Sequence, residues 1–190
     1  MQNIVGEFIN LRLLSEQDAG ITFEWRKGDR ASLLNKGAET VEQQKKWISL
    51  RPEGELNYMI ETKENKPIGM ISLIAIDKAN KRAESARFLI GEKEASRGIP
   101  AAVEAMKLLY ELAFHELGLV RIYGTIASSN KQMIKWQKYL GMQQEGALRN
   151  HYFLNGGCQD AICMGILKEE YGQVALPKMK TLMKMGQVKK

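Results

Sequence analysis

Residues 84–117 read ESARFLIGEKEASRGIPAAVEAMKLLYELAFHEL, and the rest of the chain is organised around this stretch. Its beginning is typical of a strand, a short polar loop follows, and its last part has the apolar spacing of a helix. The backbone N–H groups that begin a helix have no partners within it, and the helix dipole places positive charge there. The segment RGIPAA at residues 97–102 therefore predicts an anion site, and a phosphate group would fit it.

Two common nucleotide-binding loops do not match this segment. A Walker A loop requires a lysine and a hydroxyl residue after its last glycine, and a dinucleotide-binding loop requires three spaced glycines. An ordinary strand-to-helix turn is the other interpretation, with Gly98 at the bend and Pro100 as the first helical residue. The segment alone leaves both interpretations open.

The composition is that of one globular domain, with 190 residues of which 44% are hydrophobic and 26% charged. The apolar runs are shorter than a membrane span, and the first residues lack the features of a signal peptide, so we expect a cytoplasmic protein without a membrane span. Cys158 and Cys163 match neither a disulfide framework nor a zinc site. Both are predicted to be free thiols, and no metal is expected.

The net charge of +6 is concentrated at the C-terminal end. Five lysines and no acidic residues follow Gly172, which leaves the preceding part nearly neutral at +1. We therefore predict one domain over residues 1–171 and a lysine-rich tail over residues 172–190 that offers little core. Four apolar residues of the tail could still form a short helix: Met179, Leu182, Met183 and Met185. The body lacks the aromatic and basic interleaving of a nucleic-acid platform, so no nucleic-acid partner is expected.

The hydrophobic periodicity predicts an α/β fold with a mixed sheet. Strands are expected at residues 8–14, 57–62, 68–76, 84–91, 120–127, 143–154 and 159–167, and helices after Ser15, after Thr40, at 101–117 and at 130–140. Ser15 and Thr40 each begin a capping-box pattern, and Asn155-Gly156 is typical of a hairpin turn. The order predicts about seven mostly antiparallel strands with helices on both faces.

Several motifs together resemble the GCN5-related N-acetyltransferase (GNAT) superfamily. The segment at residues 97–102 is similar to its pyrophosphate loop, Arg-x-x-Gly-x-Gly/Ala, with Pro100 where glycine is usual. An Asn-led helix, Leu-Gly-Met, Glu-Gly-x-Leu-Arg and Asn-Gly-x-x-x-Asp then resemble its ribosomal-protein N-terminal acetyltransferase branch, over about residues 11–171. Three further segments look most like enzymes that acetylate a 4-amino sugar on a nucleotide: Trp25-Arg26, Leu148-Arg149-Asn150-His151 and Met164-Gly165-Ile166-Leu167.

The resemblance implies a GNAT fold with a splayed central strand pair and acetyl-CoA as co-substrate. The backbone of Leu89, Ile90 and Gly91 would pair with the pantetheine arm. The pyrophosphate would be held by the loop residues Arg97, Gly98, Ile99, Ala101 and Ala102. Asn130 would cap the next helix and contact the pantetheine, although a plain N-cap is an equal alternative. The tail follows all these residues and is expected to be dispensable for acetyl-CoA binding.

Acetyl transfer requires a neutral amine, a thioester held beside it and a proton for the leaving thiolate. The candidate bases are His151, which has a suitable usual pKa, and Glu84, which lies near an acidic position of relatives. A structural histidine is the alternative for His151, and a register shift of one residue would turn Glu84 to the other face. Many relatives have a tyrosine acid where Gln137 stands here, and an amide cannot donate a proton as an acid.

Trp25, Arg26 and Arg149 are candidates for the acceptor side, because arginine can bind a phosphate and tryptophan can stack on a ring. Ordinary packing explains them equally well. The predicted function is direct transfer of acetyl from acetyl-CoA to the primary amine of a small molecule, preferably an amino-sugar nucleotide. The alternatives are a protein N-terminus or an aminoglycoside as acceptor, and a non-catalytic acyl-CoA-binding module. A homodimer is left open.

Overall fold

The fold is built on one eight-stranded sheet, in a computed structural model that describes residues 3–35, 37–52 and 54–187. Its strand order is β1-β2-β3-β4-β5-β6-β8-β7, and every neighbouring pair is antiparallel except β5 and β6. The mixed sheet predicted from the sequence is therefore confirmed, with one strand more than the seven expected. The additional strand, β1, is two residues long, which is too short to produce a recognisable alternation.

The strands are β1 Ile4–Val5, β2 Ile9–Leu13, β3 Leu56–Thr62, β4 Pro67–Asp77, β5 Arg82–Ile90, β6 Arg121–Ala127, β7 Gln143–Leu154 and β8 Gly157–Leu167. The helices are α1 Ala19–Lys27, α2 Val41–Ser49, α3 Ala101–Glu111, α4 Lys131–Tyr139, α5 Lys168–Glu170 and α6 Leu176–Gln187. Two π-helical turns, Leu112–Glu116 and Tyr171–Ala175, extend α3 and join α5 to α6. None of the helices in the described ranges is both long and apolar enough to cross a membrane.

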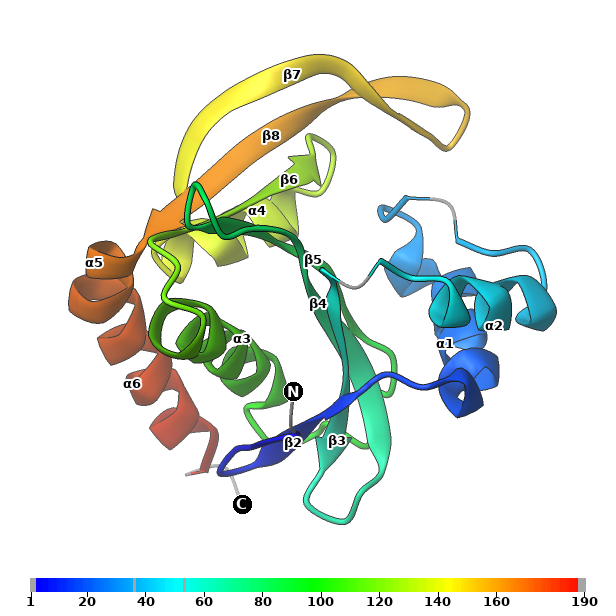
Figure 1. The fold of residues 1–190 in the computed structure, drawn as a ribbon, viewed down its shortest axis with the longest axis horizontal. Helices are drawn as coiled ribbons and strands as arrows, with labels where there is room; N and C mark the ends of the chain where they lie inside the picture. The colour runs from blue at the N-terminus through cyan, green and yellow to red at the C-terminus, as the bar shows by residue number, and fades with distance from the viewer. Residues whose placement is uncertain (1–2, 36, 53, 188–190) are drawn as a thin grey trace.

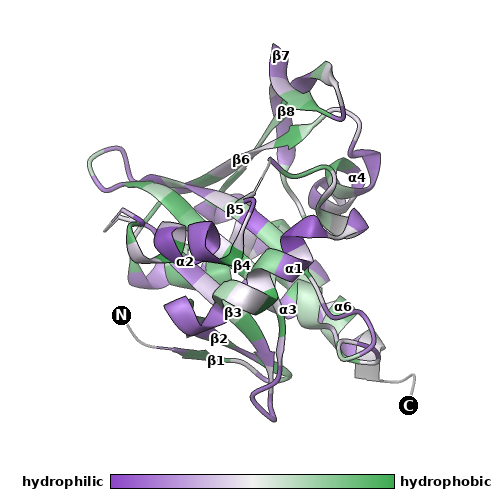
Figure 2. Ribbon diagram, turned by 90° about the vertical axis from the view of Figure 1, so that its right-hand side faces the viewer, coloured by the Kyte–Doolittle hydropathy of each residue, from purple (hydrophilic) through white to green (hydrophobic). Residues whose placement is uncertain are grey.

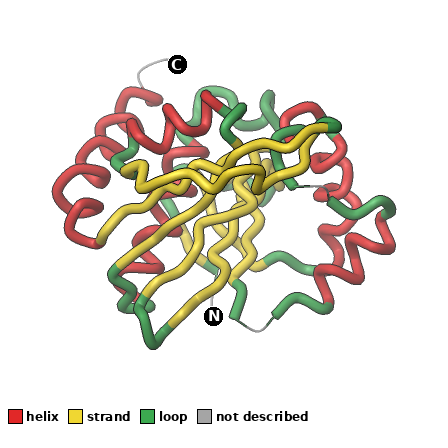
Figure 3. Tube along the Cα trace, turned by 90° about the horizontal axis from the view of Figure 1, so that it is seen from above, coloured by secondary structure: helices red, strands yellow, loops and turns green. Residues whose placement is uncertain are grey.

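Helices cover both faces of the sheet, as Figure 1 and the view from above in Figure 3 show. On one face α3 and α6 pack over a large core that contains Tyr58, Ile60 and Ile71 from the strands. On the other face α1 and α2 cover a smaller core around Met59 and Met70. The middle strands are therefore buried on both sides, whereas β7 at the sheet edge is mostly exposed and hydrophilic (Figure 2).

Local sequence signals fix several element boundaries. The Thr40 side chain accepts a hydrogen bond from the Gln43 N–H at 3.2 Å and so caps α2, as its position predicted. Asn155 and Gly156 join β7 to β8 with φ angles of 52° and 80°. Positive φ at both central residues is the geometry of a type I′ hairpin turn, so the hairpin prediction is confirmed.

The parallel pair β5 and β6 separates soon after it begins. Residues 82–84 pair with residues 121–123, and the pairing ends there. Gly124 lies so close to β5 that a Cβ atom on it would be 3.0 Å from the Ser85 carbonyl oxygen. On its other side β5 is irregular against β4, and Arg87 has a φ angle of +54°. The splayed strand pair predicted from the sequence is confirmed, and it opens the sheet in the middle.

The C-terminal segment contributes to the main core. Three residues of the predicted tail are at most 6% exposed and belong to that core, namely Ala175, Met179 and Met183, and Tyr171 just before the tail is buried there too. The expectation that the segment offers little core is therefore wrong through residue 187, while the helix that its apolar residues allowed is confirmed as α6. The lysines were the misleading signal, because the described ones, Lys178, Lys180 and Lys184, occupy the exposed face of an amphipathic helix. Lys189 and Lys190 of the predicted tail lie outside the described residues.

We expect the buried methionines of α6 to stabilise the domain. Met179→Ala should lower the free energy of unfolding by about 2–5 kcal/mol, because it leaves a cavity under a fully buried helix face. Met185→Ala is the matched control, since Met185 is 62% exposed and should change stability by less than about 0.5 kcal/mol. Urea unfolding followed by circular dichroism measures both variants. Equal, small effects would show that α6 is not part of the cooperative unit.

Candidate active site

A cavity of about 580 Å³ lies between the separated centre of the sheet and the helical segment α1–α2. This volume is typical of a small-molecule site. The lining residues come from β5, from the end of β6 with α4, from residues 26–47 and from β7. Those used below are Arg26, Trp47, Glu84, Arg87, Thr125, Asn130, Gln137 and Tyr152.

The loop before α3 presents free N–H groups where the sequence predicted an anion site. Gly98 has a φ angle of +76°, which favours glycine, and α3 begins at Ala101 with Pro100 as the preceding residue. Within the described residues, the backbone N–H groups of Gly98, Ala101 and Ala102 have no recorded backbone acceptor. The Ile99 N–H differs, because it is directed to the Ser96 carbonyl oxygen at 3.4 Å.

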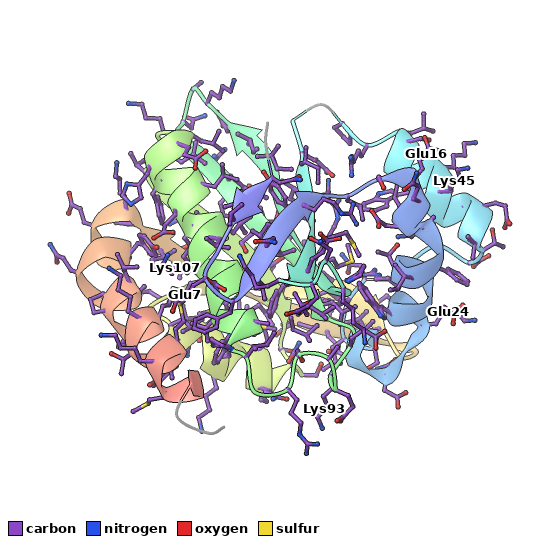
Figure 4. The ribbon with its side chains drawn as sticks, turned by 90° about the horizontal axis from the view of Figure 1, so that it is seen from below. Glu7, Glu16, Glu24, Lys45, Lys93 and Lys107 are labelled. Atoms are coloured by element: carbon purple, nitrogen blue, oxygen red, sulfur yellow. The ribbon has the colours of Figure 1, made fainter. Side chains whose placement is uncertain are left out.

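The polar side chains of this loop point away from the protein. The Arg97 side chain is exposed, and its guanidinium lies 3.3 Å from Glu94 of the same loop. Lys93 also extends outward in Figure 4. Anion binding at this loop would therefore depend mainly on backbone N–H groups, and Arg97 would contribute only as a mobile surface charge.

The end of β5 is held by Trp25 instead of lying open. A Cβ atom at Gly91 would be 2.2 Å from the Trp25 ring, so the indole packs directly on the glycine backbone. The indole N–H also donates to Glu92 at 2.8 Å, and the Trp25 side chain is buried in the smaller core. Trp25 does not line the cavity, so the structure gives it a packing role and not the acceptor-side position predicted for it. Leu89 is likewise buried in this core, which leaves only its backbone for ligand pairing.

Asn130 has both of the features that its sequence position suggested. Its side chain accepts a hydrogen bond from the Met133 N–H at 3.1 Å, which caps α4. It also lines the cavity at the end of β6. The cap is confirmed, and contact with a bound pantetheine stays a prediction.

Glu84 lines the cavity and is the last residue of β5 that pairs with β6, opposite Tyr123. Its role as a base stays a prediction. Burial raises the pKa of the Glu84 carboxyl, and the positive charges of Arg87 and His151 oppose that rise. A carboxylate with a raised pKa is better suited to accept a proton from an ammonium group than an exposed one.

His151, the other candidate base, is exposed and lies outside the cavity lining, while its neighbour Tyr152 lines the cavity. Their rings are 4.9 Å apart and nearly perpendicular. The cause is an irregularity in β7: Leu148 pairs with Ala161, whereas Tyr152 pairs with Gln159. Simple alternation along a strand does not reveal such a bulge. Arg149, in the same segment, is exposed and also outside the lining.

Two arginines line the cavity, and the sequence indicated only one of them. Arg26 lines it with a guanidinium that donates to the Asn35 carbonyl oxygen, and its role in acceptor binding stays a prediction. Burial lowers its pKa, and the charge of Arg87 adds to this effect. Arg87 is bound to Glu55 at 2.6 Å and lies 5.0 Å from the Trp47 ring. Its position in the middle of a strand gave no sign of this role.

Gln137, which stands where relatives often have a tyrosine, is 7% exposed and lines the cavity. Its carbonyl oxygen is buried and has no hydrogen-bond partner in the part of the chain that the structure describes. Buried acceptors of this kind are rare in folded proteins, and they often mark a site that a ligand or a water completes.

The sequence also matches a family model described as "Acetyltransferase (GNAT) domain" over residues 9–143. The chain belongs to the GNAT acetyltransferase family. It is 27% identical over 122 residues to the spermidine N(1)-acetyltransferase of Escherichia coli K12, which covers 64% of this chain and 63% of that protein. It is 26% identical to the uncharacterized N-acetyltransferase YokL of Bacillus subtilis, and the match covers 87% of this chain and 93% of YokL.

A third relative, the putative ribosomal N-acetyltransferase YdaF of Bacillus subtilis, is 33% identical over 54% of this chain and 55% of its own. Two solved structures share the GNAT fold. A GCN5-related N-acetyltransferase from Brucella melitensis has a TM-score of 0.79 with 22% identity, and covers 95% of this chain and 85% of its own. The Vibrio cholerae spermidine N-acetyltransferase in complex with CoA and spermine has a TM-score of 0.77 with 21% identity, and covers 88% and 100%.

The family model and the solved structures together identify a GNAT acetyltransferase domain, and acetyl-CoA is the co-substrate of this family. The residues of this chain fit acetyl-CoA. The N–H groups before and at the start of α3 suit its pyrophosphate, and the gap between β5 and β6 leaves backbone for its pantetheine arm. The open part of the gap leads to the cavity that contains Glu84, Gln137 and Tyr152.

We expect Pro100→Gly to bind acetyl-CoA as tightly as the wild type or up to about tenfold tighter. Glycine restores one N–H donor, and a hydrogen bond to a charged group contributes about 1.5–3 kcal/mol, part of which the lost rigidity of proline offsets. Calorimetry measures the Kd, with Pro52→Gly as the control because Pro52 is exposed and outside the loop. A wild type that did not bind, restored by Pro100→Gly, would show that the loop is disabled.

Proposed function

We propose that this GNAT enzyme acetylates the primary amine of a small molecule that also carries an anionic group, and that an amino-sugar nucleotide is a suitable class of acceptor. The observation that carries this proposal is the charge of the cavity. Among the described lining residues Glu84 is the one carboxylate, whereas Arg26 and Arg87 both present guanidinium groups. Glu55 neutralises Arg87, and Arg26 has no carboxylate partner among the described residues.

An incompletely paired, half-buried guanidinium favours an anionic ligand. Removing a charge from water is costly unless an opposite charge or several hydrogen bonds compensate for it. The lowered pKa of Arg26 reflects this desolvation. A phosphate or carboxylate of the acceptor would compensate it through the planar fork of donors that arginine provides. The Trp47 ring beside the cavity offers a flat apolar surface to a sugar or a base.

A polyamine is the second candidate, because relatives described as spermidine acetyltransferases match part of the chain. The positive charges of a polyamine would be repelled by Arg26, and Glu84 is the single carboxylate of the described lining that would attract them. The chain spans 63% of the length of the Escherichia coli enzyme, and identity is 27%. The relative described as a putative ribosomal acetyltransferase adds a protein N-terminus as a third acceptor to be tested.

The cavity chemistry is the same for all three acceptors. The thioester, held between β5 and β6, would lie beside Glu84, and a neutral amine would attack it. Glu84 would accept the proton that the amine nitrogen releases when the C–N bond forms. The attack forms a C–N bond, the C–S bond then breaks, and the CoA thiolate leaves. Glu84 must be ionised for this role, so the direction of its pKa shift affects the pH dependence of the rate.

The acceptor test compares an amino-sugar nucleotide, spermidine and a peptide with a free N-terminus. We expect the wild type to release CoA thiol fastest with the anionic acceptor. Arg26→Gln should raise the KM for that acceptor about tenfold to a hundredfold, corresponding to a lost charged hydrogen bond. It should lower the KM for spermidine, because it removes a like charge.

Lys45→Gln is the matched control, since it removes one positive charge from exposed α2 outside the cavity lining. Lys45 lies 3.7 Å from Glu16, and both side chains lie together at the surface in Figure 4. It should leave the KM of every acceptor within about twofold of the wild type. Turnover with spermidine alone would exclude the anionic acceptor and support the second candidate.

We expect the pH dependence of kcat/KM to identify Glu84 as the base. The wild-type rate should rise steeply at low pH, with a logarithmic slope of about 2, because both Glu84 and the acceptor amine must lose a proton. Since the Glu84 pKa is raised, the slope should fall to about 1 only above the usual range of a carboxylate. Glu84→Gln should lower the rate about 10²- to 10⁴-fold and show a slope of about 1 throughout. If only His151→Gln caused a comparable loss of rate, His151 of β7 would be the base instead of Glu84.

A further inference from the structure

We propose that Tyr152 of β7 donates the proton to the leaving CoA thiolate, and that Thr125 of β6 positions its hydroxyl group. This inference rests on the acetyl-transfer chemistry of the GNAT domain and not on the identity of the acceptor. It answers a question that Gln137 raises, since a carboxamide at the position of the usual tyrosine cannot act as an acid.

The geometry places the phenol in the cavity from the opposite side to α1 and α2. Tyr152 and Thr125 both line the cavity, and their hydroxyl oxygens are 2.6 Å apart. The Tyr152 oxygen is also 3.4 Å from the Thr125 carbonyl oxygen. The last residue of β6 that pairs with β5 is Tyr123. Thr125 lies two residues later, so it stands at the opening of the splayed strands. The thioester sulfur of a bound pantetheine arm would reach this opening.

The irregularity in β7 is what turns Tyr152 inward. Between the pairs Leu148–Ala161 and Tyr152–Gln159, three residues of β7 face one residue of β8. Asn150 has a φ angle of +50°, and its N–H donates to the Asp160 side chain at 2.9 Å. Bulges of this kind redirect a side chain and are common beside active sites. The adjacent His151 ring stacks edge-on against the phenol and limits its movement.

The charges around the phenol keep it protonated. Burial raises the pKa of Tyr152, and the nearby Glu84 on β5 and Cys163 on β8 act in the same direction, while the hydrogen bond with Thr125 acts against them. His151 on β7 is a further titratable group in contact with it. A protonated phenol at neutral pH is available as an acid. The hydroxyl of Thr125 can donate to the phenolate oxygen once the proton has left.

The proton balance of the step is complete. The amine nitrogen forms a bond to the acetyl carbon, the C–S bond breaks, and its electron pair passes to sulfur. The phenol proton of Tyr152 then moves to sulfur, and the proton that the newly bonded nitrogen releases moves to Glu84. Water restores the proton of the phenolate and removes that of Glu84, so the products are the N-acetyl amine and CoA thiol.

Gln137 has a different role in this arrangement. Its unpaired carbonyl oxygen lines the same cavity and calls for a donor that the described residues do not supply. An N–H group of the bound pantetheine or of the acceptor would satisfy it. Tyr139, the nearest tyrosine in the sequence, is 52% exposed and does not line the cavity. Tyr139 is therefore a matched control for the loss of one phenol hydroxyl.

The test measures thiol release and acetyl-CoA binding on the full chain. Tyr152→Phe should lower kcat at least about a hundredfold, within the usual range for a general acid, and leave the Kd for acetyl-CoA within about twofold. Thr125→Val should lower kcat by less than Tyr152→Phe, and Thr125→Ser should restore it, because serine keeps the hydroxyl group. Tyr139→Phe should retain wild-type rates.

Slow hydrolysis of acetyl-CoA provides the same readout without an acceptor, because it releases the same thiolate. If the wild type acetylated none of the amines tested, the proposed function would fail, and hydrolysis by Tyr152→Phe would still decide the role of Tyr152. Thiol release within threefold of the wild type would overturn the inference. It would also be overturned if the loss came with weaker acetyl-CoA binding and a lower Tm, or if Tyr139→Phe caused the loss instead.

Discussion

The separation of β5 from β6 is the constraint on which the site depends. The two strands pair in parallel over residues 82–84 only, and the sheet is antiparallel on both sides of them. Beyond Gly124 the facing backbone groups of β5 and β6 have no partner strand among the described residues, and exposed strand edges readily pair with another extended chain. We infer that an extended acyl-pantetheine arm would provide such a partner. The same opening brings residues from β5, β6, β7 and α4 around one cavity.

The separation has a structural cost, which contacts around Arg87 offset. The positive φ angle of Arg87 is unfavourable for a residue with a long side chain, by about 1–3 kcal/mol. Its guanidinium binds Glu55 and Asn57, and Asn57 is held by Ser72 of β4 at 2.7 Å. Stacking on Trp47 then joins this network to α2. The bent strand and the helical cover of the cavity are thus stabilised by one side chain, which explains an arginine in the middle of the sheet.

How much the sequence could predict depended on whether a feature is local. The hairpin at Asn155, the cap at Thr40 and the glycine bend at Gly98 are set by residues within one turn, and each was predictable from a short pattern. Glu84 and Arg26 were also identified, because the family motif fixes their strand and helix. By contrast, Tyr152 lines the cavity beside an irregularity in β7, whereas its neighbour His151 was the residue predicted, for the chemistry of its imidazole group.

Long-range packing was the other source of difference. Trp25 was expected beside the acceptor, but the space left by Gly91, more than sixty residues away, accepts its ring and buries it. The lysines of residues 172–190 suggested a tail that offers little core, whereas Met179 and Met183 of α6 are buried in the core. Neither outcome follows from composition, because each depends on which surfaces the fold brings together.

Packing of α6 also gives a physical reason for Pro100, the residue that departs from the family loop. A Cβ atom on Gly186 would lie 3.3 Å from Pro100, so the helix and the loop are in close contact at a position without a side chain. The proline ring fills this space and fixes the backbone just before α3, where a glycine would leave both a gap and a more flexible loop. The lost N–H donor is thus exchanged for packing that holds the neighbouring N–H groups of Ala101 and Ala102 in place. The C-terminal helix, although it lies outside the cavity, thereby helps to hold the loop before α3 in place.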